Sequence, residues 1–131
     1  MDLKKSYFIG APPEDVWRAL TDPAVIDAWG GGPAEMSAEP GTPFSLWGGD
    51  IHGTVTAAEA PVRLVQDWWG GPDWKTPSVV TFELESEGDG TVLTLTHTGV
   101  PEDVSGDFDA GWDDYYLGPL RDLLVGWGDP S

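Results

Sequence analysis

The feature that most constrains this chain is a change in the spacing of its apolar residues near Pro101. Between residues 34 and 99 the apolar runs are short and are separated by Gly, Pro and Asp, which is typical of antiparallel strands in a meander. Beyond Pro101 the apolar side chains recur at helical spacing. The pattern therefore predicts an α+β domain in which an antiparallel sheet is followed by one long closing helix.

The predicted sheet has about seven strands. Alternating side chains within the strands predict that Phe82 points to one face of its strand, and that Leu95 and His97 share the interior face of theirs. An Asp-Gly pair at Asp89-Gly90 favours a hairpin turn between these two strands, because such pairs tolerate positive φ. The expected strands are residues 3–10, 34–39, 43–48, 51–60, 62–69, 78–87 and 91–99.

Helices are predicted on both sides of the meander. Pro12-Pro13 and Asp22-Pro23 each favour a helix start, so two short helices should follow the first strand and end at the glycines after Trp29. In the closing helix, Gly118-Pro119 predicts a kink or a restart, because proline lacks a backbone donor and crowds the preceding turn. Its apolar stripe comprises Val104, Phe108, Trp112, Tyr116, Leu120, Leu124 and Trp127.

Aromatic residues are more abundant than a small core needs, with 8 Trp, 4 Phe and 3 Tyr. The surplus either lines a cavity or faces a partner, because large aromatic side chains gain from leaving water. We expect a mostly apolar pocket between the sheet and the closing helix. The alternative is that several of these side chains only fill the core. The candidate ligand-binding residues are Trp29, Phe44, Leu46, Trp68, Trp74, Phe82, Leu95, His97, Trp112 and Tyr116.

The charge of the chain excludes some partners. Six Lys and Arg against 23 Asp and Glu give a formal charge of −17, which repels nucleic acids and anionic membrane surfaces. The absence of Cys excludes disulfides, thiol nucleophiles and thiolate metal sites. No apolar run has the length of a membrane span, and the first residues do not resemble a signal peptide. A cytoplasmic location is expected.

Catalytic and metal-binding signals are weak. His97 is the one candidate acid or base, and it could equally hydrogen-bond a ligand or be a buried histidine satisfied by a backbone group. Asp107-x-Asp109-x-Gly111 begins like a calcium loop but has glycine where a third oxygen ligand belongs, so a solvated helix face is favoured. Nucleophile elbows and phosphate-binding glycine loops are also missing. We therefore predict no metal, no cofactor and no enzyme signature.

Several blocks of the sequence resemble one family. Residues Ile9 to Pro23 (IGAPPEDVWRALTDP), followed by Trp29, resemble the opening of activator of Hsp90 ATPase homologue-like domains. These domains belong to the START and birch-pollen-allergen-like (SRPBCC) superfamily. Further matches are the hairpin at 80–84 and 91–99 and the closing helix around Gly111-Trp112. The resemblance covers nearly the whole chain as a single domain, 1–131, and implies a helix-grip fold, with a curved sheet wrapped around the closing helix. Gly118-Pro119 and the Trp-rich segment 68–74 depart from the family pattern.

The resemblance leaves three functions open, because this fold carries many activities. The expected function is non-enzymatic binding of a small apolar or aromatic molecule. The first alternative is a protein-binding module of the co-chaperone type, whose partner is a chaperone or another protein. The second alternative is an enzyme of the polyketide cyclase or aromatase type, in which His97 moves a proton.

Overall fold

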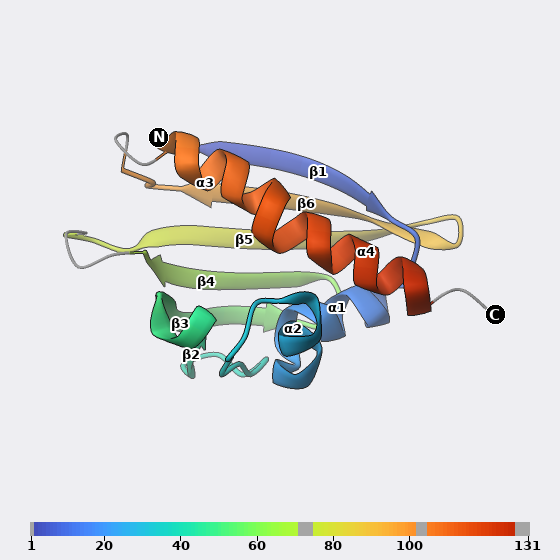
Figure 1. Ribbon diagram of the computed structural model, residues 1–131, viewed down its shortest axis with the longest axis horizontal. Helices are drawn as coiled ribbons and strands as arrows, with labels where there is room; N and C mark the ends of the chain where they lie inside the picture. The colour runs from blue at the N-terminus through green and yellow to red at the C-terminus, as the bar shows by residue number, and fades with distance from the viewer. Residues whose placement is uncertain (1, 71–74, 102–104, 128–131) are drawn as a thin grey trace.

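A single antiparallel sheet forms the body of the protein (Figure 1). The computed structural model describes residues 2–70, 75–101 and 105–127, without the side chains of Ser105 and of residues 125–127. Six strands lie in the order β1-β6-β5-β4-β3-β2, and every neighbouring pair is antiparallel. Their bounds are β1 Leu3–Ile9, β2 Pro43–Leu46, β3 Ile51–Glu59, β4 Arg63–Trp69, β5 Ser78–Glu87 and β6 Gly90–Thr98.

The segment 34–39, which we predicted to be a strand, is not one. It touches the sheet through a single bridge in which the backbones of Glu35 and Ser45 exchange two hydrogen bonds. Pro33 and Pro40 flank the segment and lack the N–H group that a longer ladder would use. The predicted strand 43–48 also ends early, because Trp47–Gly49 form a 3₁₀ turn (η1) in which Trp47 and Gly48 both have positive φ. The sheet therefore has six strands.

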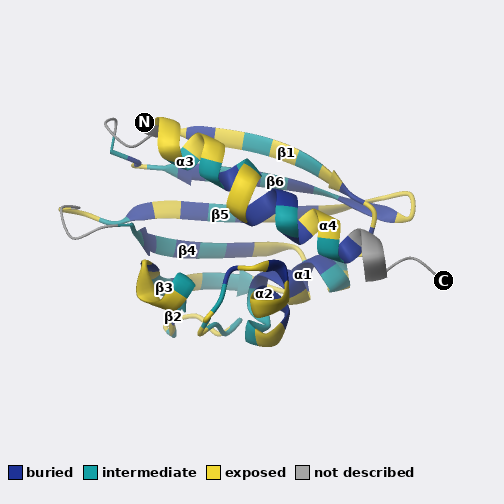
Figure 2. Ribbon diagram, viewed as in Figure 1, coloured by how far each residue is buried: buried dark blue, intermediate teal, exposed yellow. Residues whose placement is uncertain are grey.

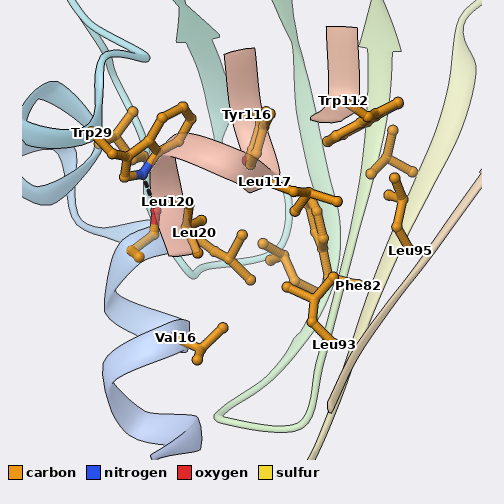
Figure 3. Packing of buried hydrophobic residues seen from close by; sticks show 14 of the residues in the cluster. Val16, Leu20, Trp29, Phe82, Leu93, Leu95, Trp112, Tyr116, Leu117 and Leu120 are labelled. Atoms are coloured by element: carbon orange, nitrogen blue, oxygen red, sulfur yellow. Dashed lines mark hydrogen bonds between the residues drawn. The ribbon is translucent and has the colours of Figure 1, made fainter. Parts of the chain in front are cut away.

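The two predicted short helices are present as α1 (Pro13–Thr21) and α2 (Pro23–Trp29). Proline occupies the first turn of each, and the Asp22 side chain caps α2 by accepting from the Ala24 N–H at 3.0 Å. Gly30, at φ +104°, ends α2 in the left-handed conformation. The Trp29 Nε1–H donates to the Ala19 carbonyl at 2.8 Å and joins the two helices (Figure 3).

The closing helix crosses the sheet diagonally as one continuous run (Figure 1). It comprises α3 (Ser105–Gly111), a π-helical turn η3 (Trp112–Leu117) and α4 (Gly118–Trp127). The restart predicted at Gly118-Pro119 is a change of winding, because the Gly118 N–H bonds to the Asp113 carbonyl five residues earlier. A Cβ on Gly118 would overlap that carbonyl oxygen, so the π turn requires glycine at this position.

The core lies between the helix and the sheet face that it covers. Burial alternates along the strands, as Figure 2 shows. Figure 3 shows Trp112 and Leu117 of the helix directed towards Phe82, Leu93 and Leu95 of β5 and β6. Full burial of each such side chain contributes roughly 1.5–3 kcal/mol. Leu117 lies off the predicted helical stripe, and the extra residue of the π turn brings it into the core beside Tyr116.

Candidate functional site

A cavity of about 350 Å³ lies beside the closing helix, between its first turns and the connection from β2 to β3. Its wall comes from three places: η1 and the start of β3, the end of β4, and the helix from α3 into the π turn. The volume falls in the range of small-molecule sites. The lining residues are Trp47, Ile51, Trp68, Asp107, Phe108, Gly111, Trp112, Tyr115 and Tyr116.

The structure places three of the candidate ligand-binding residues in this lining: Trp68, Trp112 and Tyr116. Trp74 lies outside the described residues. The other candidates are buried in the core and are absent from the cavity wall. They are Trp29, Phe44, Leu46, Phe82, Leu95 and His97.

Four apolar lining residues were missed by the sequence analysis: Trp47, Ile51, Phe108 and Tyr115, of which only Phe108 lay on the predicted helical stripe. Trp47 was placed in an extended strand, whereas its φ of +51° turns the chain away. Gly48-Gly49 was the available signal for that turn, since both residues adopt positive φ. Tyr115 lies one residue off the stripe and is 67% exposed at the cavity.

The cavity wall belongs to a continuous cluster of aromatic rings. Trp68 and Trp112 stack with ring centroids 4.8 Å apart and an interplanar angle of 30°. Tyr116 packs against Trp112 at 4.7 Å and against Trp29 of α2 at 4.6 Å. Aromatic pairs of this kind add about 0.5–1.5 kcal/mol each beyond their buried area. The wall is therefore fixed by packing that reaches from β4 to α2.

His97 is fully buried behind this wall, and both of its ring nitrogens are occupied. The Trp112 Nε1–H donates to His97 Nδ1 at 3.1 Å, and His97 Nε2 lies 2.7 Å from the Ser78 hydroxyl oxygen. Because an indole nitrogen can only donate, Nδ1 must be the acceptor and the ring proton sits on Nε2. The Ser78 hydroxyl accepts a hydrogen bond from this N–H and donates one to the Trp68 carbonyl oxygen, 3.2 Å away.

This network defines what His97 can do. Burial lowers the pKa of His97 to about 4, which keeps the imidazole neutral. The lone pair on Nδ1 of His97 already accepts from Trp112, and its Nε2–H already donates to Ser78. To act as a general base, His97 would first have to break the buried hydrogen bond from Trp112. The geometry instead connects Trp112 to the backbone of Trp68. The histidine is satisfied, although by side chains and not by the backbone group that we considered.

Tyr116, which is also buried, differs from His97 in its hydrogen bonding. Its hydroxyl is buried and has no hydrogen-bond partner among the described residues. Burial raises the pKa of Tyr116, because the phenolate would lose its solvation. An unpaired buried hydroxyl costs about 1–3 kcal/mol, so this residue contributes packing at the expense of one unsatisfied polar group.

The other flank of the helix is fastened to β1. Lys5 Nζ lies 2.7 Å from Asp109 and 3.0 Å from Asp113, and the Tyr7 hydroxyl donates to Asp113. Burial, followed by the hydrogen bond to Asp113, raises the pKa of Tyr7 to about 12. The Tyr7 hydrogen bond and the Lys5 charge lower the pKa of Asp113. These polar contacts hold the helix on the β1 side, while its other side lines the cavity.

Neither a cluster of metal ligands nor a membrane-spanning helix is found in the described part of the chain. Within it, no three His, Asp or Glu side chains gather as a metal site would require. Across the same residues, no helix is both long and apolar enough to cross a membrane.

Comparison with known proteins adds the family. The model for the family described as Activator of Hsp90 ATPase homolog 1-like protein matches residues 10–124. Among solved structures, the chain is 29% identical to PFC0360w, an HSP90 activator from Plasmodium falciparum. That superposition covers 95% of this chain and 96% of the other, with a TM-score of 0.87.

Two further relatives limit what can be inferred about this chain from its similarity to known proteins. The chain is 30% identical to CalU16 from Micromonospora echinospora, over 99% of this chain and 68% of the other, with a TM-score of 0.81. It is 23% identical to the human activator of 90 kDa heat shock protein ATPase homolog 1. That alignment covers 96% of this chain but spans only 37% of the human protein. The chain belongs to the family of Activator of Hsp90 ATPase homolog 1-like proteins.

Proposed function

We propose that the protein binds a small, mainly aromatic or apolar molecule in the cavity beside the closing helix, without carrying out chemistry on it. The observation that carries the proposal is the cavity itself, about 350 Å³ in volume, with aromatic rings at six of the nine lining residues that the structure describes. A dry cavity of about 150 Å³ accommodates benzene, so this one has room for roughly two fused rings with a short substituent.

The rigidity of the wall supports the same proposal. Stacking of Trp68 on Trp112 and the hydrogen bonds through His97 and Ser78 fix these side chains before any ligand arrives. A preformed site loses less side-chain entropy on binding, so less of the favourable binding free energy is offset. An enzymatic role receives no comparable support, because the described lining residues do not include His97 and contain no paired acid and base.

Binding to an HSP90-type chaperone is the second candidate function. It is favoured by similarity over almost the full length of the HSP90 activator from Plasmodium falciparum. Tyr115, which is exposed on the helix, offers an aromatic contact for a protein partner. An ATPase assay with the host's HSP90-type chaperone tests this function. A rate unchanged by saturating protein would exclude stimulation of that ATPase.

The ligand proposal is tested by closing the cavity. Gly111 lines it, and a Cβ on this residue would meet only the Tyr115 ring, at 4.0 Å. Gly111→Leu should therefore place a side chain in the cavity without disturbing the core, and it should favour the helix by removing a glycine. Gly106→Leu is the matched control, because it makes the same change in α3 at an exposed position outside the lining.

Isothermal titration calorimetry with a set of one-ring and two-ring aromatic compounds provides the readout. We expect saturable binding to the unmodified protein and to Gly106→Leu, and a loss of at least tenfold in affinity in Gly111→Leu. Circular dichroism checks that both variants are folded. Binding that survives Gly111→Leu unchanged would place the ligand elsewhere, and an absence of binding across the set would reject the proposal.

A further inference from the structure

The described lining of the cavity carries a negative charge. Among the described lining residues Asp107, in the first turn of α3, is the only one with a carboxylate, and its side chain is exposed. It has no ion-pair partner among the described residues. Its full negative charge exceeds the roughly half positive charge at the start of a helix. None of the lining residues that the structure describes carries a positive side chain.

The basic residues of the chain lie outside the cavity wall. Lys5 pairs with Asp109 and Asp113 on the β1 side, and the Arg121 guanidinium lies 5.6 Å from the centroid of the Tyr7 ring. The remaining surface carries most of the formal charge of −17. A negatively charged ligand would therefore approach against repulsion and would find no partner for its charge in the lining.

The aromatic rings of the lining also favour a positively charged ligand. The π-system of Trp or Tyr attracts a cation, and several such rings around one space form the kind of cage that holds quaternary ammonium groups. Here Trp47, Trp68, Trp112, Tyr115 and Tyr116 all line one cavity with Asp107 beside them. An ammonium group on an aromatic body would gain from the rings and from the carboxylate together.

We propose that the ligand of this cavity is an aromatic organic cation, with its ring body among the tryptophans and its ammonium group near Asp107. The inference rests on the proposed function, because it names the chemical class of ligand for the same cavity. It excludes fatty acids and other anionic amphiphiles as preferred ligands.

Three probes with the same naphthyl body separate the alternatives. They are (2-naphthylmethyl)trimethylammonium, neutral 2-naphthylmethanol and anionic 2-naphthylacetate, titrated into the complete protein by calorimetry at low ionic strength. We expect the cation to bind at least tenfold more tightly than the alcohol, and the acetate to bind most weakly. High salt should reduce the advantage of the cation, because the exposed carboxylate is screened.

Substitutions of acidic residues test whether the preference for the cation depends on Asp107. Asp107→Asn should reduce the preference for the cation over the alcohol at least threefold, and Asp107→Glu should retain it. Asp114→Asn is the control, because Asp114 is exposed on the same helix, lies outside the lining and changes the net charge equally. An equal effect of Asp114→Asn would attribute the preference to net charge and would overturn the assignment to Asp107.

The outcomes distinguish the two proposals. Equal affinities for the three probes, or the tightest binding by the acetate, would overturn the cation assignment while leaving a cavity that binds aromatic molecules. Absence of binding by all three would reject both. Binding of the cation that is unaffected by Gly111→Leu would show that it sits on the acidic surface, which would also overturn the inference.

Discussion

Acidification should destabilise this protein through His97. The folded protein keeps His97 neutral down to about pH 4, whereas the unfolded chain takes up the proton near the ordinary pKa of 6.5. Between these values the unfolded state binds more protons, so the free energy of unfolding falls as the pH falls. The stability from this residue is complete above about pH 6.5 and is lost progressively on the way to about pH 4.

The magnitude follows from the two pKa values. The two pKa values of His97 differ by about 2.5, so complete protonation lowers the free energy of unfolding by about 3 kcal/mol. About 2 kcal/mol of this loss falls between roughly pH 7 and pH 4.5. Carboxylates also titrate in this range, and their protonation relieves the repulsion of the −17 charge. The contribution of His97 must therefore be measured as a difference between two proteins with the same carboxylates.

The comparator is His97→Gln, which keeps a donor and an acceptor but does not titrate. Urea unfolding followed by tryptophan fluorescence gives the free energy of unfolding for both proteins at several pH values. Between roughly pH 7 and pH 4.5 the unmodified protein should lose about 2 kcal/mol more than the variant. Parallel curves, within about 0.5 kcal/mol, would refute the buried neutral imidazole. NMR titration of the His97 ring in a His52→Gln background should give a midpoint near pH 4.

Three further substitutions test the packing of the helix. Tyr116→Phe should raise the free energy of unfolding by about 1 kcal/mol in urea melts, because it removes an unpaired buried hydroxyl; a clear loss would mean that the hydroxyl is bonded. Gly118→Ala should cost about 1–3 kcal/mol in thermal melts, since its Cβ overlaps the Asp113 carbonyl; unchanged stability would contradict the π turn. Asp113→Asn should cost up to about 1 kcal/mol in urea melts, less at high salt; equal costs at both ionic strengths would argue against the Lys5 ion pair.

Local signals in the sequence were enough to predict most of the fold. Pro13 and the Asp22 cap are confirmed as helix starts. In β4 the alternation places Trp68 on the buried face, in phase with Leu64. The hairpin from β5 to β6 is also confirmed, although its positive φ falls on Gly88, one residue before the predicted Asp-Gly pair.

The candidate site was harder to predict, because its wall depends on contacts between distant segments. Trp47 reaches the cavity only because η1 turns the chain there, and one hydrogen bond from its backbone N–H to the Gly31 carbonyl holds the turn in place. Tyr115 reaches it through the wider winding of the π turn, which a strict helical period cannot anticipate. The periodicity found most of the helix residues that face the core but missed Leu117, and the cavity lies at the margin of that core.

The central claim is that this cavity takes an aromatic ligand, and tryptophan side chains report on it directly. Two-dimensional ¹H–¹⁵N NMR resolves the indole N–H signals, and Trp47, Trp68 and Trp112 line the cavity, whereas Trp17 of α1 does not. On titration with 2-naphthylmethanol, the signals of the three lining tryptophans should shift saturably while that of Trp17 stays in place. Lining signals that remain unmoved at the highest probe concentration, or a shift confined to Trp17, would contradict the account.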